Sequence, residues 1–350
     1  MNAAAIAFTE VFVSDKANTL FAFLFGLGFW VQMQRLESRG AQFARIYQRR
    51  LAVLLCFGLI NLLLIWPWDI LNLYAITGFI LFALRGLSAR AMLIWGLGLA
   101  LLGKPIIQHV TDWLGIVEPA DKLAFGEAAI AVRQDAYING SYFDWVEVTA
   151  SLVYYDWIAN GLIVAWILYA LGRFLVGAYV ARRGWIQRSG ELLPQMRRIC
   201  IIALPLGLAM ETLRVMLEDG EVAPPWVADT LHVVGVPILD LGYVTGMILL
   251  YHSARFGKIA AMFAPVGRMA LTNYLVQGVF IGAILYGFHG GLALSGQIEP
   301  KAVLALCFGF FALQIGISHW WLGRYRFGPM EWLWRTLTYG ERPAMRAQPA

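Results

Sequence analysis

The sequence predicts an all-α, polytopic membrane protein in which about nine helical segments cross the bilayer. Two observations predict this fold class. Of the 350 residues, 60% are hydrophobic and only 14% are charged, whereas a soluble domain is roughly 45–50% apolar and about 25% charged. The apolar residues also come in blocks of roughly 17–25, which match the hydrocarbon thickness of a bilayer. The apolar residues do not form the amphipathic stripes that are typical of water-soluble helices.

The apolar blocks divide the chain into segments without an intervening soluble domain. Residues 1–350 are therefore expected to form a single integral membrane domain. The segments cover about 18–34, 51–66, 70–84, 91–110, 157–179, 199–217, 231–251, 265–288 and 301–322.

Two of these segments are short and leave two arrangements open. The second and third meet at residues 66–69, with the sequence Trp66-Pro67-Trp68-Asp69. As full spans they form a tight hairpin with Asp69 at the outer interface, and as a re-entrant hairpin they bring Asp69 deep into the membrane. Full spans are favoured, because Trp66 and Trp68 suit an interfacial aromatic belt.

Basic residues predict the orientation. Of the 27 Lys and Arg, 20 lie in alternate connections and the C-terminal tail. The positive-inside rule puts these connections and the C-terminus in the cytoplasm, and parity then puts the N-terminus outside. Because the first residues contain no basic leader, we expect a further helix before Met1 in the complete protein.

Ionisable residues inside apolar segments are costly and are functional candidates for that reason. Glu211 and Arg214 are three residues apart on one helix face, which predicts a structural pair that neutralises its own charge. His232 and Asp240 point to the same side of one helix, about 12 Å apart along its axis. Asp240 lies near mid-membrane without a cation on its own helix, so it is a candidate for chemistry or for packing.

A third polar group follows the start of the eighth segment. Arg268, Thr272, Asn273 and Gln277 are spaced along a polar helix face. Such a face needs either a water-filled cavity or a polar partner helix. Cavity lining is the favoured interpretation, with interhelical hydrogen bonding as the alternative.

The sequence lacks the motifs that are typical of several classes of function. Three cysteines lie inside apolar blocks without metal-ligand spacing, so no metal site and no bound cofactor are predicted. A Walker loop, an HExxH motif and a GxSxG motif are absent. The net charge of +5 is spread over short connections, which indicates membrane orientation and no nucleic-acid partner.

The C-terminal third carries a specific resemblance. The stretches 267–274 (GRMALTNY), 326–335 (RFGPMEWLWR) and 338–340 (TYG) closely resemble the YeiB-like family of bacterial inner-membrane proteins. Residues 20–28 (LFAFLFGLG) and 69–74 (DILNLY) also fit, and the region 190–345 is the most family-specific. Members of this family usually begin with another hydrophobic helix that carries an Asp-x-x-Arg-Gly element, and this chain has no match to it.

The resemblance implies a location and a range of activities. It implies the bacterial cytoplasmic membrane, with the lipid bilayer as partner and the oligomeric state left open. Family members are described as possible transporters, and their helical layout looks like that of transmembrane acyltransferases, including heparan-α-glucosaminide N-acetyltransferase. These implications rest on the family and not on residue spacing.

The first functional hypothesis is acyl transfer at or across the membrane. Acyl-CoA would be the cytoplasmic donor, held near Arg268, and a small molecule, lipid or glycan would be the acceptor. Asp69, His232 and Asp240 are the candidate acids or bases. Asn273 would orient the acceptor or stabilise an oxyanion, with Thr272 and Gln277 completing the substrate-binding face.

Two alternatives remain open. In a secondary transporter of a small or amphipathic solute, Asp240 would bind a proton or cation and the face from Arg268 to Gln277 would line the path. The third hypothesis is a truncated or inactive structural relative. It is considered because a further helix is expected before Met1.

Overall fold

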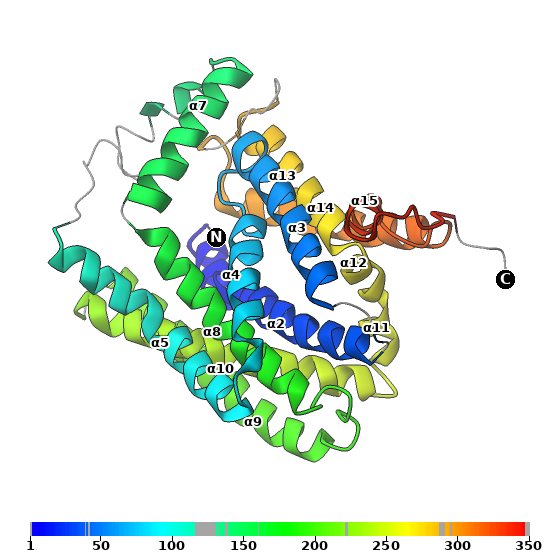
Figure 1. Cartoon of the computed structure of the whole chain (residues 1–350). Helices are drawn as coiled ribbons and strands as arrows, with labels where there is room; N and C mark the ends of the chain where they lie inside the picture. Colours follow the sequence, from blue (N-terminus) through cyan, green and yellow to red (C-terminus); the bar gives the residue numbers. More distant parts are fainter. Residues whose placement is uncertain are drawn as a thin grey trace.

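The computed structural model is helical throughout the part of the chain that it describes (Figure 1). This part comprises residues 2–38, 40, 43–115, 131–132, 134–136, 139–159, 161–220, 223–286, 291–294 and 296–346. An isolated antiparallel bridge between Tyr325 and Arg346 is the only β pairing within these residues. The all-α prediction is confirmed for them.

The helices follow one another with short connections. Their bounds are α1 Asn2–Phe12, α2 Lys16–Glu37, α3 Phe43–Leu64, α4 Leu71–Ala83, α5 Ala89–Trp113, α7 Tyr142–Leu152, α8 Leu162–Arg182, α9 Leu193–Asp219, α10 Pro225–His252, α11 Gly257–Met262, α12 Ala264–Arg268, α13 Ala270–Leu285, α14 Pro300–Leu322 and α15 Pro329–Tyr339. A 3₁₀ turn, Leu84–Gly86, follows α4, and a π-helical stretch, Val153–Ala159, precedes α8.

Five of these helices are long and apolar enough to cross a membrane: α3, α8, α9, α10 and α14. A sixth crossing results if the bent pair Gly257–Arg268 and Ala270–Leu285 counts as one broken span. The bend between its two parts is 75°. Each predicted apolar segment falls on a helix, but nine crossings and their direction stay predictions.

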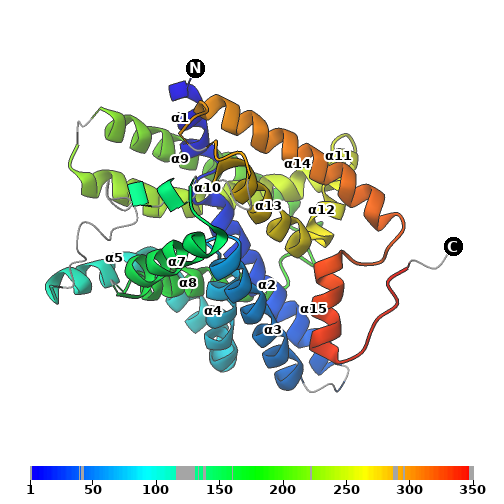
Figure 2. The same ribbon diagram turned by 90° about the horizontal axis from the view of Figure 1, so that it is seen from above.

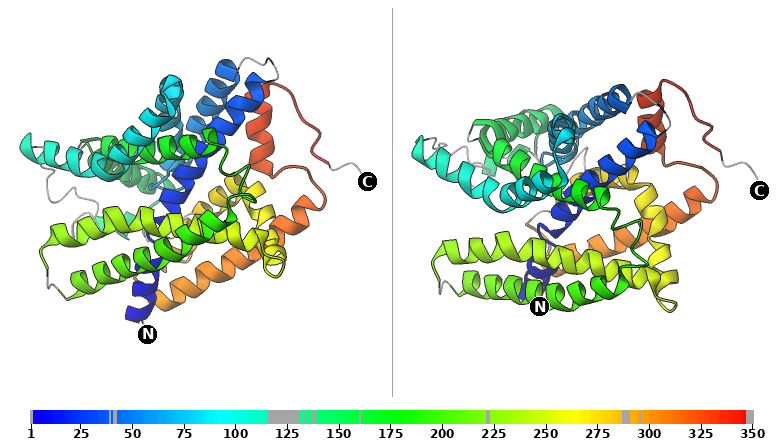
Figure 3. Two further views of the ribbon diagram at one scale, coloured as in Figure 1. Left: turned by 90° about the horizontal axis from the view of Figure 1, so that it is seen from below. Right: turned by 60° about the horizontal axis from the view of Figure 1, so that its bottom comes forward.

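The central helix α2 separates two groups of helices. On one side it packs against α8, which in turn packs against α5 and α4. On the other side lies the hairpin of α9 and α10, which contacts α2 through α10. Figures 2 and 3 show α2 crossing between these two groups, with α15 at the edge of the molecule near the C-terminal ends of α2 and α14.

The main apolar core lies on the α5–α8 side of α2. Phe29 of α2, Tyr47 of α3, Leu81 of α4 and Phe174 of α8 are its large members, each at most 2% exposed. Burying a large apolar side chain contributes about 1.5–3 kcal/mol, so this cluster stabilises the packing of α2, α3, α4 and α8. The apolar side chains left exposed, such as Trp95 and Phe308, lie on outward faces of the helices, as expected where lipid is the solvent.

Candidate functional site

A cavity of about 320 Å³ lies beneath α15. It is lined by Arg50 from α3, Arg268 from α12 and residues from the segment that contains α15. These are Arg326, Phe327, Glu331, Trp334, Arg335, Thr338 and Tyr339. Four guanidinium groups therefore surround one hollow that contains a single carboxylate.

Aromatic rings lie against three of the arginines, most closely against Arg50 and Arg335 and at 5.7 Å against Arg326. The guanidinium carbon of Arg50 lies 4.0 Å from the centroid of the Trp334 ring, and the indole Nε1 of Trp334 donates to the Arg50 carbonyl at 3.0 Å. Arg335 lies 4.7 Å from the Phe327 ring centroid. Stacking on aromatic faces limits the rotamers of an arginine and leaves its N–H groups available in the plane.

The one carboxylate of the cavity is engaged by another helix. Thr272 donates to Glu331 from its backbone N, to Oε1 at 3.0 Å, and from its hydroxyl, to Oε2 at 2.6 Å. The Met330 backbone N donates to the same hydroxyl at 3.1 Å. These bonds join the start of α15 to the start of α13, so Thr272 positions the wall of the cavity.

The four arginines of the cavity have no acidic partner in the described part of the chain. Ion pairs there join other residues, and no carboxylate oxygen lies within 4.0 Å of a guanidinium nitrogen of Arg50, Arg268, Arg326 or Arg335. Like charges brought together repel one another unless an anion is bound between them. The cavity thus has the charge and the donors of a site for an anion such as a phosphate.

The other members of the predicted polar face join α13 to α14. Asn273 donates to the Ser318 hydroxyl at 3.2 Å, and Gln277 donates to the side-chain oxygen of Gln314 at 2.7 Å. Gln314 in turn donates to the Asn273 carbonyl at 3.0 Å. Of the predicted polar face, Arg268 lines a cavity, as the favoured interpretation expects. Asn273 and Gln277 instead form hydrogen bonds to a neighbouring helix, as the alternative expects.

Asp69 lies in the turn between α3 and α4 and is fully buried. Its Oδ1 accepts from the Asn61 amide at 2.7 Å and from the Tyr274 hydroxyl at 3.0 Å. Its Oδ2 accepts from the backbone N and the side-chain amide of Asn72, both at 2.9 Å. Burial raises the pKa of Asp69 above its usual value, although these hydrogen bonds act in the opposite direction. The carboxyl group holds the α3–α4 turn against α13.

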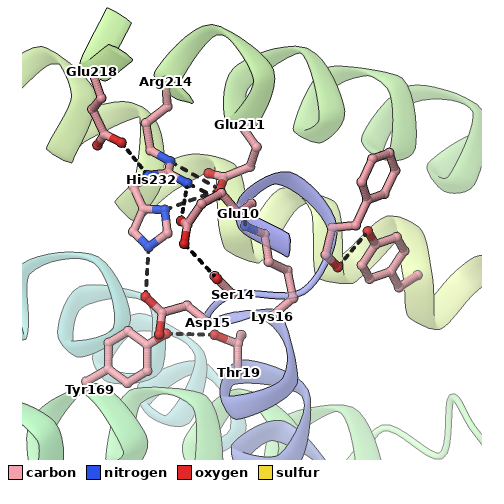
Figure 4. A network of polar contacts seen from close by, with 12 residues as sticks. Glu10, Ser14, Asp15, Lys16, Thr19, Tyr169, Glu211, Arg214, Glu218 and His232 are labelled. Carbon is pink, nitrogen blue, oxygen red and sulfur yellow. Dashed lines mark hydrogen bonds and ion pairs between the residues drawn. The ribbon is translucent and has the colours of Figure 1, made fainter. Parts of the chain in front are cut away.

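A buried network of charges lies where α1, α2, α9 and α10 meet (Figure 4). The Lys16 ammonium, 1% exposed, lies 2.6 Å from Glu211 Oε2 and donates to the Glu10 carbonyl at 2.6 Å. Arg214 pairs with Glu10 at 2.9 Å and with Glu218 at 2.7 Å. It lies 3.5 Å from Glu211 Oε2, so Glu211 and Arg214 are close together but share their charges with further residues.

His232 joins this network through both ring nitrogens. Nε2 lies 2.8 Å from Asp15 Oδ2, and Nδ1 lies 3.2 Å from Glu211 Oε2. Two carboxylates facing one imidazole suit the protonated ring, because only that form can donate from both nitrogens. His232 therefore has no free nitrogen with which to accept a proton in this arrangement.

Asp240 lies beside this network without joining it. It is 5% exposed, and neither of its carboxyl oxygens has a hydrogen-bond partner among the described residues. Arg173 and Lys16 are the cations that act on it electrostatically. Arg173 is 4% exposed. It donates hydrogen bonds to the Thr19 hydroxyl, the Ala100 carbonyl and the Tyr169 carbonyl.

The predicted site residues thus fall into four places, of which one is the α13–α14 contact of Asn273 and Gln277. Arg268 and Thr272 belong to the cavity and its wall, Asp69 belongs to the α3–α4 turn, and Glu211, Arg214 and His232 form one network with Asp240 next to it. Among the described residues no group of three or more His, Cys, Asp or Glu side chains could hold a metal ion.

Sequence reasoning missed several residues of these sites. Arg173 carried a usable signal, because it is a single charge inside the apolar segment 157–179. Lys16, Asp15 and Glu331 lie outside the apolar blocks and carry no such signal. The contribution of Arg50 and Arg335 to one cavity depends on α15 folding back against α3, which no local pattern indicates.

Comparison with known proteins identifies a family but no known structure. A family model described as "Protein of unknown function (DUF418)" matches residues 180–341. The chain is 34% identical to the uncharacterized protein YxaH of Bacillus subtilis (strain 168), over 96% of the chain and 82% of that relative. It is 30% identical to the uncharacterized protein YeiB of Escherichia coli (strain K12), over 95% of the chain and 84% of that relative. No solved structure matches.

Proposed function

Because the chain belongs to the YeiB-like DUF418 family, whose activity is open, we propose that it transfers an acyl group from cytoplasmic acyl-CoA to an acceptor at or across the membrane. The observation that carries this proposal is the cavity beneath α15, whose four arginines pair with no acidic residue in the described part of the chain. We place the protein in the bacterial cytoplasmic membrane, with the cavity on the cytoplasmic side, where the positive-inside rule puts α15.

The chemistry of acyl-CoA fits the cavity. The donor carries a diphosphate, a 3′-phosphate and a purine ring at the end remote from the thioester. Guanidinium groups bind phosphate through paired N–H donors, and Arg268, Arg326 and Arg335 are exposed enough to reach a ligand from solution. Tyr339 and Phe327 offer faces on which a purine can stack.

The transfer itself needs a proton acceptor. The acceptor's hydroxyl or amine attacks the thioester carbonyl, its proton passes to a base, the C–S bond breaks, and the departing thiolate takes up a proton. Of the three predicted candidates, Asp69 and His232 already use their acceptor atoms. Neither carboxyl oxygen of Asp240 has a hydrogen-bond partner among the described residues, so we assign it the role of base, which it fills in its ionised form.

Transfer of a labelled acyl group tests the proposal. The full chain, reconstituted in vesicles, is supplied with radiolabelled acetyl-CoA and with bacterial lipid and glycan acceptors. We expect labelled product or acyl-enzyme from the wild type, at least a tenfold loss of rate in Arg268→Ala, and no product in Asp240→Asn. Folded wild-type protein that yields neither product nor acyl-enzyme with any acceptor would count against acyl transfer.

A further inference from the structure

The helices around the buried network form two tightly packed units. In the hairpin of α9 and α10, a Cβ added at Gly207 would lie 2.6 Å from the backbone of Leu239, and one added at Gly242 would lie 2.8 Å from the backbone of Leu204. In the pair of α2 and α8, a Cβ at Gly26 would overlap the Phe174 carbonyl oxygen. Backbones this close interlock, so each unit behaves as a rigid body.

The boundary between the two units is formed by polar and charged side chains, whereas close backbone packing holds each unit together. There Lys16 of α2 meets Glu211 and His232 of the hairpin of α9 and α10 (Figure 4). Asp240 of α10 lies within the electrostatic influence of Lys16 and of Arg173 from α8. Polar contacts of this kind can exchange partners at lower cost than interlocked backbones can. Relative movement of the units is therefore expected at this boundary.

Neither carboxyl oxygen of Asp240 has a hydrogen-bond partner in the described part of the boundary. A buried carboxylate without a hydrogen-bond donor is strongly disfavoured, and such a group is either neutral or paired. The hydrogen bonds of the two nearby cations go to other groups, since Lys16 bonds Glu211 and the Glu10 carbonyl and Arg173 bonds Thr19 and two carbonyls. A bound proton removes the uncompensated negative charge of the group.

The surroundings of Asp240 decide what its ionisation would do. The charged groups that act on it are Arg173 of α8, Lys16 of α2, Glu211 of α9 and Asp15 of the α1–α2 turn. The titratable groups that accompany them are His232 and Tyr243 on α10 and Tyr169 on α8. The two cations belong to the α2–α8 unit, so a negative Asp240 is attracted toward that unit and a neutral one is not.

We propose that Asp240 is a proton-binding site at the boundary between the two units, and that loss of its proton draws the hairpin of α9 and α10 toward Lys16 and Arg173. The site goes beyond acyl transfer and does not depend on what the cavity beneath α15 binds. It makes the arrangement of the two units respond to pH, whether or not acyl-CoA is present.

Infrared spectroscopy of the full chain in vesicles tests proton binding. A protonated carboxyl group in an apolar site gives a C=O stretching band that disappears when the group ionises. We expect such a band to titrate in the wild type, to be absent in Asp240→Asn and to persist in Glu218→Gln, a matched control whose carboxylate is half exposed in the same network. Spectra of wild type and Asp240→Asn that agree at every pH would overturn the assignment.

A distance measurement tests the coupling to movement. Spin labels are placed at Val164 of α8 and Met216 of α9, which are 44% and 66% exposed, with the native cysteines replaced by serine. The label-to-label distance should change with pH in the wild-type background and stay constant in Asp240→Asn. A distance independent of pH in both backgrounds would contradict the coupling, and a shift that survives in Asp240→Asn would assign it to another group.

Discussion

Lys16 and Glu211 form an ion pair in which both side chains are at most 2% exposed. Removing one partner of such a pair leaves the other charge buried and typically costs about 3–5 kcal/mol. We therefore expect Lys16→Met to lower the free energy of unfolding by about that amount, measured by denaturant unfolding in detergent. Lys301→Met breaks an exposed pair with Glu299 and should change it by less than about 1 kcal/mol.

A double replacement shows whether the loss comes from the unpaired charge. Lys16→Met combined with Glu211→Leu removes both charges, so it should recover part of the stability that Lys16→Met loses. Equal stability of Lys16→Met and Lys301→Met would contradict a buried pair between Lys16 and Glu211 in the folded protein.

Asp69 gives a second prediction at the scale of the residue. Four hydrogen bonds end on its carboxyl group, so Asp69→Ala leaves the amides of Asn61 and Asn72 without an acceptor. Each unsatisfied buried donor costs about 1–3 kcal/mol. We expect a large loss of thermal stability in detergent and an unchanged affinity for acyl-CoA in the protein that remains folded. A stable Asp69→Ala protein that binds acyl-CoA but transfers no acyl group would instead assign Asp69 to the chemistry.

The sequence predicts which intramembrane residues gather at the polar junction, but it does not predict the residues that they contact. The cost of a charge in an apolar segment singled out Glu211, Arg214, His232 and Asp240, and these residues do gather at one junction. Their main partners could not be predicted, since Asp15 of the α1–α2 turn and Lys16 at the start of α2 lie about 200 residues away in sequence. A contact over that separation depends on the tertiary arrangement and leaves no periodic pattern.

At the scale of the element, the close packing of α2 against α8 predicts how glycine substitutions in α2 change stability. Gly26 of α2 leaves no room for a side chain because the Phe174 carbonyl lies against it, whereas the space around Gly28 is open. Gly26→Ala should separate the two helices and destabilise the protein by about 1–3 kcal/mol. Gly28→Ala, two residues along the same helix, should be neutral or slightly stabilising. Thermal unfolding in detergent measures both, and equal effects would contradict the close approach.

Helical elements were predictable because hydrophobic blocks are a local signal. Each of the predicted apolar segments falls on a helix, but the segment 265–288 is broken near Met269 into α12 and α13, with a 75° bend. The helix α15 was not predicted, because Pro329–Tyr339 is only 11 residues long and holds no apolar block long enough to mark a crossing. The contact between Trp334 of α15 and Arg50 joins residues 284 positions apart, so no local pattern indicates it.

The orientation of the whole molecule is predicted by its basic connections. A cysteine at Gln187, between α8 and α9, should react with a membrane-impermeant thiol reagent only after the cells are permeabilised. A cysteine at Lys301, where α14 begins, should react in intact cells. Both variants are made without the native cysteines. The reverse pattern of labelling would invert the orientation and place the cavity beneath α15 outside the cell.

The central claim is that the cavity beneath α15 binds acyl-CoA, and calorimetric titration of acyl-CoA into the purified protein tests it most directly. The predicted result is saturable binding that weakens at least tenfold in Arg268→Ala and Arg335→Ala, as expected for loss of a charge-assisted hydrogen bond worth about 1.4 kcal/mol or more. Binding should stay unchanged in Arg255→Ala, which removes an arginine that does not line the cavity. Absence of saturable binding, or equal binding in all three variants, would contradict the claim.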